Sequence, residues 1–172
     1  MKWFVLSLLL VAVVAPSASA VTLVNTDGSA AQPFQSWASK AAVPMADAQV
    51  SVDRDMSTCL GRPACFSVDH LHVSNAVGSF TLYHELGHAF DAYALNWPRR
   101  HRLKVALGYT RETVWYQPGV PGPSETFADA YAVLALYGGC GGWMVNDLGW
   151  GYGYKAVCSS LRAVRKIIRE AA

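Results

Sequence analysis

The chain has no strong excess of charge of either sign. It has 172 residues, with fourteen lysines and arginines against twelve aspartates and glutamates, so the formal net charge is +2 at pH 7. Proteins that bind nucleic acid or acidic membranes through their overall field carry a far larger positive excess. The composition therefore excludes a general attraction for either, and any partner must be inferred from particular residues.

Long hydrophobic runs are absent beyond the first twenty residues. One lysine precedes a nearly unbroken apolar run over residues 3–14, and Ala18-Ser19-Ala20 places small residues where a signal peptidase cleaves. The run is shorter than the roughly 20 residues that a membrane-spanning helix needs. We expect residues 1–20 to be a signal peptide and the mature chain to be secreted, extracellular and free of the membrane. A retained membrane anchor is the less favoured alternative.

Internal repeats and low-complexity tracts are also lacking, and the length suits one domain with its own core. Residues 21–33 are small and polar and show no clear periodicity, so they predict a loose N-terminal segment. We expect residues 34–172 to form a single domain that exists as a monomer.

Cysteines are few, and no two have Cys-x-x-Cys spacing. The chain has Cys59, Cys65, Cys140 and Cys158. An even number of this size in an exported chain predicts two disulfides. Three pairings are possible, and proximity in the sequence favours Cys59 with Cys65 and Cys140 with Cys158. A thiolate metal site is the alternative, and the spacing argues against it.

Hydrophobic periodicity predicts a small α+β domain. Residues 48–53 and 64–72 alternate apolar and polar side chains around a turn-rich segment, which predicts a β-hairpin stapled by the first disulfide. Residues 110–117 also have the composition of a strand. Helices are expected at 34–42, from 77 or 79 to 95, at 99–107, at 125–136 after an N-cap at Ser124, and at 155–170.

Two stretches near the C-terminus have a structural and a functional interpretation. Residues 138–154 combine glycines with aromatic residues, which we interpret as a structural loop bracketed by a disulfide, with a substrate-binding rim as the alternative. The last predicted helix places Arg162, Arg165, Lys166 and Arg169 largely away from its apolar face. A solvated basic face is favoured there over a site for an anionic surface.

The segment His84-Glu85-Leu86-Gly87-His88 is an HExxH motif within a predicted helix. Residues i and i+4 lie on the same helical face, so both imidazoles can reach one metal ion. The carboxylate of Glu85 lies beside them and can take a proton from a zinc-bound water that attacks a peptide carbonyl. The motif therefore predicts a site for one Zn²⁺ ion with its own general base.

A catalytic zinc has three protein ligands and one open position, so a third ligand is expected. Glu125 and Asp129 lie one turn apart on a later predicted helix. Glu125 is the predicted ligand, and Asp129 the predicted acceptor for the distal nitrogen of a ligand histidine. The alternative for Glu125 is an acid favoured by the helix dipole. Asp91, on the same face as His84 and His88, is a second candidate acceptor.

These two segments resemble the gluzincin metallopeptidases, in which one helix carries HExxH and a later helix the glutamate ligand. The sequences HELGHAFD at 84–91 and SETFADAYA at 124–132 look especially like lethal-factor-like catalytic domains. The resemblance covers about residues 79–136. It implies a small zincin-like metallopeptidase domain with a short antiparallel β-sheet or hairpin and active-site helices. It also implies that a tyrosine stabilises the oxyanion, for which Tyr116 is the nearest candidate. Independently of the resemblance, the side chain of His101 is a second candidate donor to the oxyanion.

Two other zinc arrangements are disfavoured. The metzincin and snapalysin pattern needs a glycine and then a further ligand after the second histidine, but Asp91 and Ala94 occupy those positions. His70 and His72 would share one strand face and have no further partner at ligand spacing, so surface or hydrogen-bonding roles are favoured over a second metal site.

The sequence therefore predicts a secreted zinc-dependent endopeptidase that acts on a protein or peptide substrate. An extended substrate would pair with the exposed hairpin edge at 64–72. The alternative is a secreted non-catalytic binding module, or an inactive zincin that retains its zinc site. Binding of metal without hydrolysis of any peptide would favour that alternative.

Overall fold

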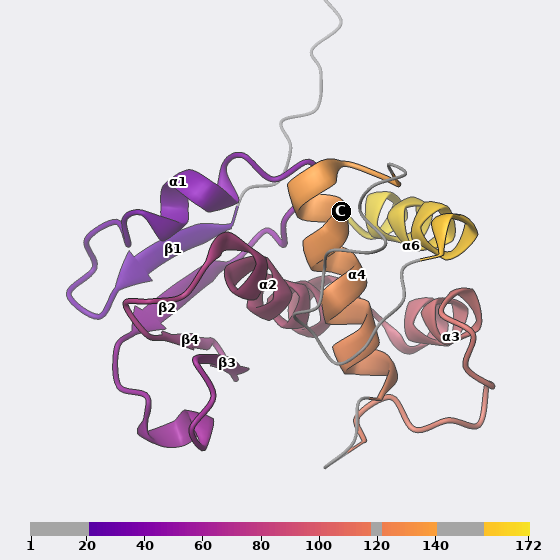
Figure 1. The fold of residues 1–172 in the computed structure, drawn as a ribbon, viewed down its shortest axis with the longest axis horizontal. Helices are drawn as coiled ribbons and strands as arrows, with labels where there is room; N and C mark the ends of the chain where they lie inside the picture. Colours follow the sequence, from indigo (N-terminus) through magenta and orange to yellow (C-terminus); the bar gives the residue numbers. More distant parts are fainter. Residues whose placement is uncertain (1–20, 118–121, 141–156) are drawn as a thin grey trace, which may run out of the picture.

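The computed structural model describes residues 21–117, 122–140 and 157–172. The expected signal peptide, residues 1–20, and most of the segment 138–154 lie outside this part of the chain. The fold is α+β, as the sequence predicted, with the sheet and α1 on one side and the other helices toward the opposite side (Figure 1). Helices α2 and α4 lie between the sheet and the helical pair α3 and α6.

The sheet has four strands in the order β1-β2-β4-β3. Their bounds are Thr22–Asn25 for β1, Gln49–Asp53 for β2, Ala64–Ser67 for β3 and His70–Val73 for β4. Strands β1 and β4 both pair with β2 in parallel, and only β3 pairs antiparallel, with β4. The sheet is therefore mixed rather than antiparallel as expected, and β3 forms one of its edges.

The expectation of a loose segment at 21–33 was wrong. Strand β1 lies within it, and the side chains of Val21, Leu23 and Ala31 are buried. The strand is only four residues long, so its alternation is too short to show as a period in the sequence.

The predicted strand at 64–72 is two strands. The chain turns at Val68, whose φ is 57°, and returns as β4. A turn of two residues preserves the apolar-polar alternation on both sides, so the pattern continued through it. Strand β2 pairs with the returning strand in parallel, because β3 and β4 form the hairpin with each other.

The helices have the following bounds: α1 Phe34–Ala38, α2 Ser79–Ala94, α3 Trp97–Ala106, α4 Pro123–Tyr137 and α6 Cys158–Ala171. Asn96 is the N-cap of α3, because its side chain accepts a hydrogen bond from the N–H of Arg99. The N-cap of α4 is Gly122 and not Ser124, with Pro123 in the first turn, where a missing N–H costs nothing. The strand predicted at 110–117 was wrong, since those residues form turns.

The core lies between the sheet and the helices. Buried side chains come from β1, β2 and β4, from α2 and α4, and from one face of α6. The largest include Leu23, Leu71, Leu82, Leu86, Phe90, Phe127, Tyr131, Leu161 and Ile168. The basic residues of α6 lie outside its buried stripe, as the periodicity predicted.

Helices α2 and α4 cross in close contact at Gly87. A Cβ added there would lie 2.9 Å from the Cα of Ala128, which is closer than side chains tolerate. The glycine therefore lets the two backbones approach, and this approach brings the first turn of α4 under the 84–88 stripe of α2.

Both favoured disulfides are confirmed. Cys59 pairs with Cys65 and ties the 3₁₀ helix η1 (Ser57–Cys59) to β3, and Cys140 pairs with Cys158 at the start of α6. Among the described residues, the structure contains no helix with the length and apolar character that a membrane span requires.

Candidate metal centre

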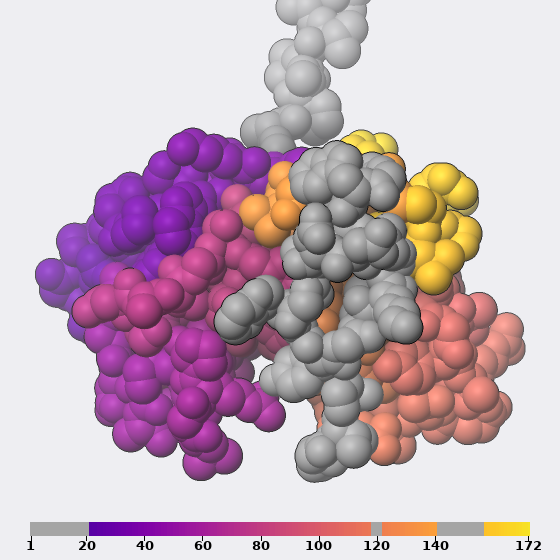
Figure 2. Space-filling view, viewed as in Figure 1, coloured from indigo at the N-terminus to yellow at the C-terminus, as the bar shows by residue number. Residues whose placement is uncertain are grey.

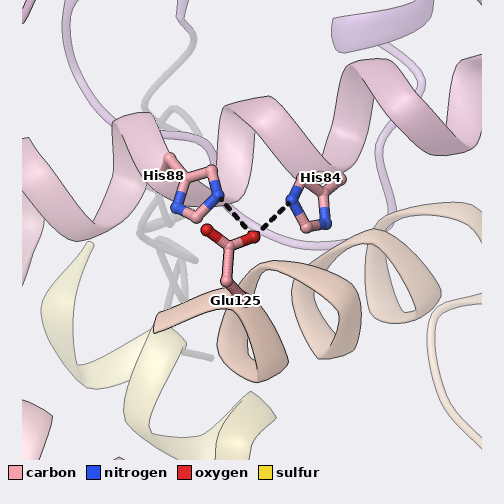
Figure 3. Close-up of side chains that lie close together, drawn as sticks. All are labelled: His84, His88 and Glu125. Atoms are coloured by element: carbon pink, nitrogen blue, oxygen red, sulfur yellow. Dashed lines mark ion pairs between the residues drawn. The ribbon is translucent and has the colours of Figure 1, made fainter. Parts of the chain in front are cut away.

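Three side chains from two helices converge on one point. His84 and His88 project from α2 toward the carboxylate of Glu125, which lies in the first turn of α4 (Figure 3). The Nε2 atoms of His84 and His88 lie 3.3 Å and 3.5 Å from Glu125 Oε2. The ring centroids of the two imidazoles are 4.9 Å apart, edge to face.

The spacing of these atoms fits a tetrahedral metal ion. Two ligand atoms that each lie about 2.1 Å from a tetrahedral ion are about 3.4 Å apart. The candidate ligand atoms of His84, His88 and Glu125 all lie within 4.8 Å of one another. This group of described residues could therefore hold one metal ion.

The surroundings of Glu125 Oε2 also fit a site that could hold a metal ion. Glu125 Oε2 is buried, and no described residue makes a hydrogen bond to it. The two imidazole nitrogens are its ion-pair partners, at 3.3 Å and 3.5 Å. Buried carboxylate oxygens usually accept hydrogen bonds as well, so this oxygen could instead bind a metal ion.

Asp129 orients the first histidine. Nδ1 of His84 lies 2.8 Å from Oδ1 of Asp129, and both side chains are buried. A carboxylate at Nδ1 accepts the ring proton and leaves Nε2 to face the site, which is the usual arrangement around metal-binding histidines. The structure places Asp129 where the sequence predicted it.

The electrostatics of the site are dominated by the pairing of imidazole and carboxylate. Burial alone lowers the pKa of His84, but its contacts with Asp129 and Glu125 raise that pKa to about 10. Burial would raise the pKa of Glu125, yet the two imidazoles hold it well below its usual range. A cation replacing the imidazole proton would therefore meet a carboxylate that is already ionised.

Glu85 lies beside these ligands and is almost fully buried. The backbone N–H of Phe66 on β3 donates a hydrogen bond to its carboxylate. Burial raises the pKa of Glu85, while the neighbouring His84 and His88 oppose that rise. The carboxylate of Glu85 thus lies between α2 and the edge strand of the sheet.

A cleft of about 350 Å³ is lined by His84, Glu85 and His88 of the motif and by Glu125. Strand β3 and the preceding turn form one side, and α2, α4 and Tyr116 form the rest. In the space-filling view the surface is hollowed beside the magenta lobe that carries η1 and β3 (Figure 2). Arg62, Phe66 and Val68 border the cleft on the β3 side.

Asp91 does not serve as the expected acceptor for a ligand histidine. Its Oδ1 accepts from Nε of Arg100, and its Oδ2 accepts from Nε1 of Trp115 and from the hydroxyl of Tyr116. These three donors come from α3 and from the segment that follows it. Asp91 therefore joins α2 to α3 and to residues 115–116.

The two candidates for oxyanion stabilisation lie in different places. Tyr116 borders the cleft and is half-exposed, and burial together with Asp91 raises its pKa to about 12. Its catalytic role stays a prediction. His101 lies in a separate groove between α3 and α6, so its proposed role at the oxyanion was wrong.

Sequence reasoning missed three contributors to this region. Arg100 and Trp115 bind Asp91, and Phe66 binds Glu85 through its backbone. A basic and an aromatic residue near a loop carry no specific pattern, and a backbone contact depends on no side chain at all. None of the three had a signal in the sequence that could have identified it.

No family model matches the chain, and no significant match to it was found among curated proteins or solved structures. The interpretation of the site therefore depends on its own geometry and chemistry.

Proposed function

We propose that this protein is a secreted zinc-dependent endopeptidase of the gluzincin type. One observation carries the proposal: a buried carboxylate oxygen of Glu125 that makes no hydrogen bond to the described residues faces two imidazole nitrogens at 3.3 Å and 3.5 Å. Two disulfides among the described residues support an oxidising compartment outside the cell.

The donor set favours zinc among the common metals. Two imidazoles and one carboxylate are typical ligands of catalytic zinc, whereas calcium and magnesium prefer oxygen ligands alone. Three protein ligands would leave one of the four positions of a tetrahedral zinc ion for a ligand from outside the protein. A zinc ion held there supplies Lewis acidity, which polarises a peptide carbonyl and acidifies a nearby water.

The residues of the chain have distinct roles in this proposal. Glu85 takes a proton from a water in the cleft onto its carboxylate and returns that proton to the leaving amine. The N–H of Phe66 holds this carboxylate in place. Asp129 keeps the ring of His84 in the tautomer that presents Nε2 to the site.

An extended substrate would lie along β3, the edge strand that borders the cleft. Alternate residues of an edge strand direct their N–H and C=O groups away from the sheet. Phe66 is such a residue, because its N–H reaches Glu85. A peptide beside β3 would place its scissile bond next to the base that this strand positions.

The decisive experiment compares peptide cleavage with metal content. The chain from Val21 onward is incubated with a peptide library with and without added zinc, and bound metal is measured by mass spectrometry. We expect zinc-dependent cleavage by the wild-type protein and none by Glu85→Gln, with zinc retained in both. Glu112→Gln, the same change at an exposed position, is the matched control and should cleave normally.

Two outcomes would contradict the proposal. Hydrolysis that persists in Glu85→Gln would exclude Glu85 as the base. A wild-type protein that binds zinc and cleaves no member of the library would favour the non-catalytic binding module instead.

A further inference from the structure

A second hollow lies on the helical side of the molecule, between α3 and α6. These two helices pack against each other, one above the other at the right of Figure 1. The groove has a volume of about 660 Å³, larger than the cleft of the metal centre. Apolar side chains of both helices line it: Val105 and Ala106 of α3, and Ala163 and Ile167 of α6.

Basic side chains also line the groove, next to these apolar residues. Arg102 and His101 come from α3, Lys166 comes from α6, and Arg111 comes from the segment after α3. All four are exposed. Arg102 pairs with Glu170 at 2.7 Å, but both side chains remain partly open to solvent, at 49% and 38%.

The groove lies in the basic half of a chain whose net charge is small. Nine of the fourteen lysines and arginines lie on α3, on α6 or at Arg111, but only two of the twelve acids, Glu112 and Glu170, lie in the same regions. A net charge of +2 therefore conceals an uneven distribution of charge, with a basic excess on these elements and an acidic excess in the rest of the chain.

Part of this basic charge has a structural use. Arg100 pairs with Asp91, Arg99 donates to backbone carbonyls of Ala94 and Glu170, and Lys104 is buried against the carbonyls of Arg111 and Thr113. The cations around the groove are different residues. Their position beside exposed apolar surface such as Val105, which is 55% exposed, suits a ligand that is both apolar and acidic.

The shape of the groove selects among such ligands. A flat membrane surface cannot reach the floor of a concave groove between two helices. A small anion would engage one or two of the cations and leave the apolar floor exposed. An amphipathic helix fills a groove between helices with one face and presents charged residues on both sides of it.

We propose that the groove between α3 and α6 binds an acidic amphipathic helix of a partner protein. The apolar stripe of that helix contacts Val105 and Ala163, and its carboxylates pair with Arg111 and Lys166. This inference does not depend on the metal centre or on catalysis.

The test uses a fluorescein-labelled peptide of about four helical turns, with leucines at i, i+4 and i+7 between glutamates. Binding to the chain from Val21 onward is measured by fluorescence anisotropy in low and in physiological salt. A scrambled peptide of the same composition and liposomes of anionic phospholipid are measured in parallel. The Glu85→Gln protein is used in repeat experiments so that cleavage of the peptide cannot imitate dissociation.

Two groove variants and one control decide the outcome. Arg111→Glu combined with Lys166→Glu should weaken binding roughly tenfold or more, while Lys40→Glu, a charge reversal at an exposed residue that does not line the groove, should not. Val105→Lys adds positive charge but removes apolar floor, so it should also weaken binding. Circular dichroism checks that each variant is folded, which is expected because every substituted residue is exposed.

Several results would overturn the proposal. Equal binding of the scrambled peptide, or tighter binding by Val105→Lys, would show attraction by charge alone. Preference for the anionic liposomes would assign the face to a lipid surface. Absence of saturable binding to the helical peptide would leave the basic groove as a solvated surface.

Discussion

Two polar clusters lie one turn apart on helix α2 and differ in how completely they are hydrogen-bonded. Around Asp91, both carboxylate oxygens accept bonds, from Arg100, Trp115 and Tyr116. Around His84 and His88, the facing carboxylate of Glu125 keeps a buried oxygen that makes no hydrogen bond to the described residues. The first cluster is fully hydrogen-bonded within the protein, whereas the second could hold a metal ion.

The two acids at these clusters differ in their partners, although Asp91 lies on α2 and Glu125 faces α2 from α4. Asp91 lies on the face of α2 that Glu125 contacts, and the sequence predicted that both acids belong to the metal site. Their partners distinguish them, because buried charges are stable only when they are paired or bound to metal. Loss of Asp91 should therefore affect folding, and loss of Glu125 should affect metal binding.

The largest expected effect is that of Asp91→Ala on stability. Its side chain is 2% exposed, and its removal leaves the guanidinium of Arg100 and the indole N–H of Trp115 without their acceptor. Breaking a buried pair in this way costs about 3–5 kcal/mol of unfolding free energy. Urea denaturation of the metal-free protein measures it. The surface pair of Asp69 with His70 supplies the control, since Asp69→Ala should cost less than about 1 kcal/mol.

Glu125→Ala should weaken zinc binding more than it lowers the stability of the metal-free protein. Loss of one ligand should cost about 3–4 kcal/mol of zinc binding, or roughly 10²–10³-fold in Kd, if each ligand contributes equally to a typical zinc site. The metal-free protein should lose less stability than Asp91→Ala causes, because the side chain of Glu125, which pairs with His84 and His88, is 22% exposed and that of Asp91 only 2%. Competition with a chromogenic chelator measures Kd, with Glu112→Ala as the control. Unchanged zinc affinity would show that Glu125 is not a ligand.

Asp129→Asn tests the support of the first histidine with a smaller effect. An amide in place of the carboxylate weakens the hydrogen bond to Nδ1 of His84 and removes a charge that raises its pKa. Substitution of such a partner typically costs 10–100-fold in metal affinity. Titration with zinc under the same conditions measures this loss, and an affinity equal to wild type would remove Asp129 from the metal site.

Tyr116→Phe should have the smallest effect. It tests whether Tyr116, which lines the cleft and donates to Asp91, belongs to the Asp91 cluster or to the candidate metal site. Its hydroxyl donates to Asp91, so its loss should cost about 0.5–1.5 kcal/mol of stability while Arg100 and Trp115 still hold Asp91. We expect kcat on the best library peptide to remain nearly unchanged. A fall in kcat of about 10²-fold or more, with KM constant, would instead assign Tyr116 to the oxyanion.

The candidate site was largely predictable because it depends on helical spacing. His84 and His88, like Glu125 and Asp129, are pairs four residues apart, and α-helical geometry puts each pair on one face in any fold. The helices α2 and α4 were recognisable from their apolar periodicity and nearby breakers. The pairing of neighbouring cysteines was favoured for a related reason, since short loops close most readily.

The features that were mispredicted depend on distant parts of the chain. The parallel pairing of β2 with β4 and the incorporation of β1 are set by how strands pack together, and strand alternation does not encode pairing direction. The partners of Asp91 come from a second helix and a turn, so they could not be inferred from α2 alone. Because Asp91 lies on the same helical face as His84, the sequence indicated a role beside the histidines instead.

The sequence by itself determined that two imidazoles would share one helical face with the carboxylate of Glu85 beside them, because the period of the α-helix is a local property of the backbone. Only the tertiary structure decided that Glu125 would meet them, through the close crossing of α2 and α4 at Gly87. It also decided that Asp91 would be fully hydrogen-bonded by α3 and residues 115–116. These outcomes depend on which helices pack together, and packing depends on the whole core rather than on any one segment.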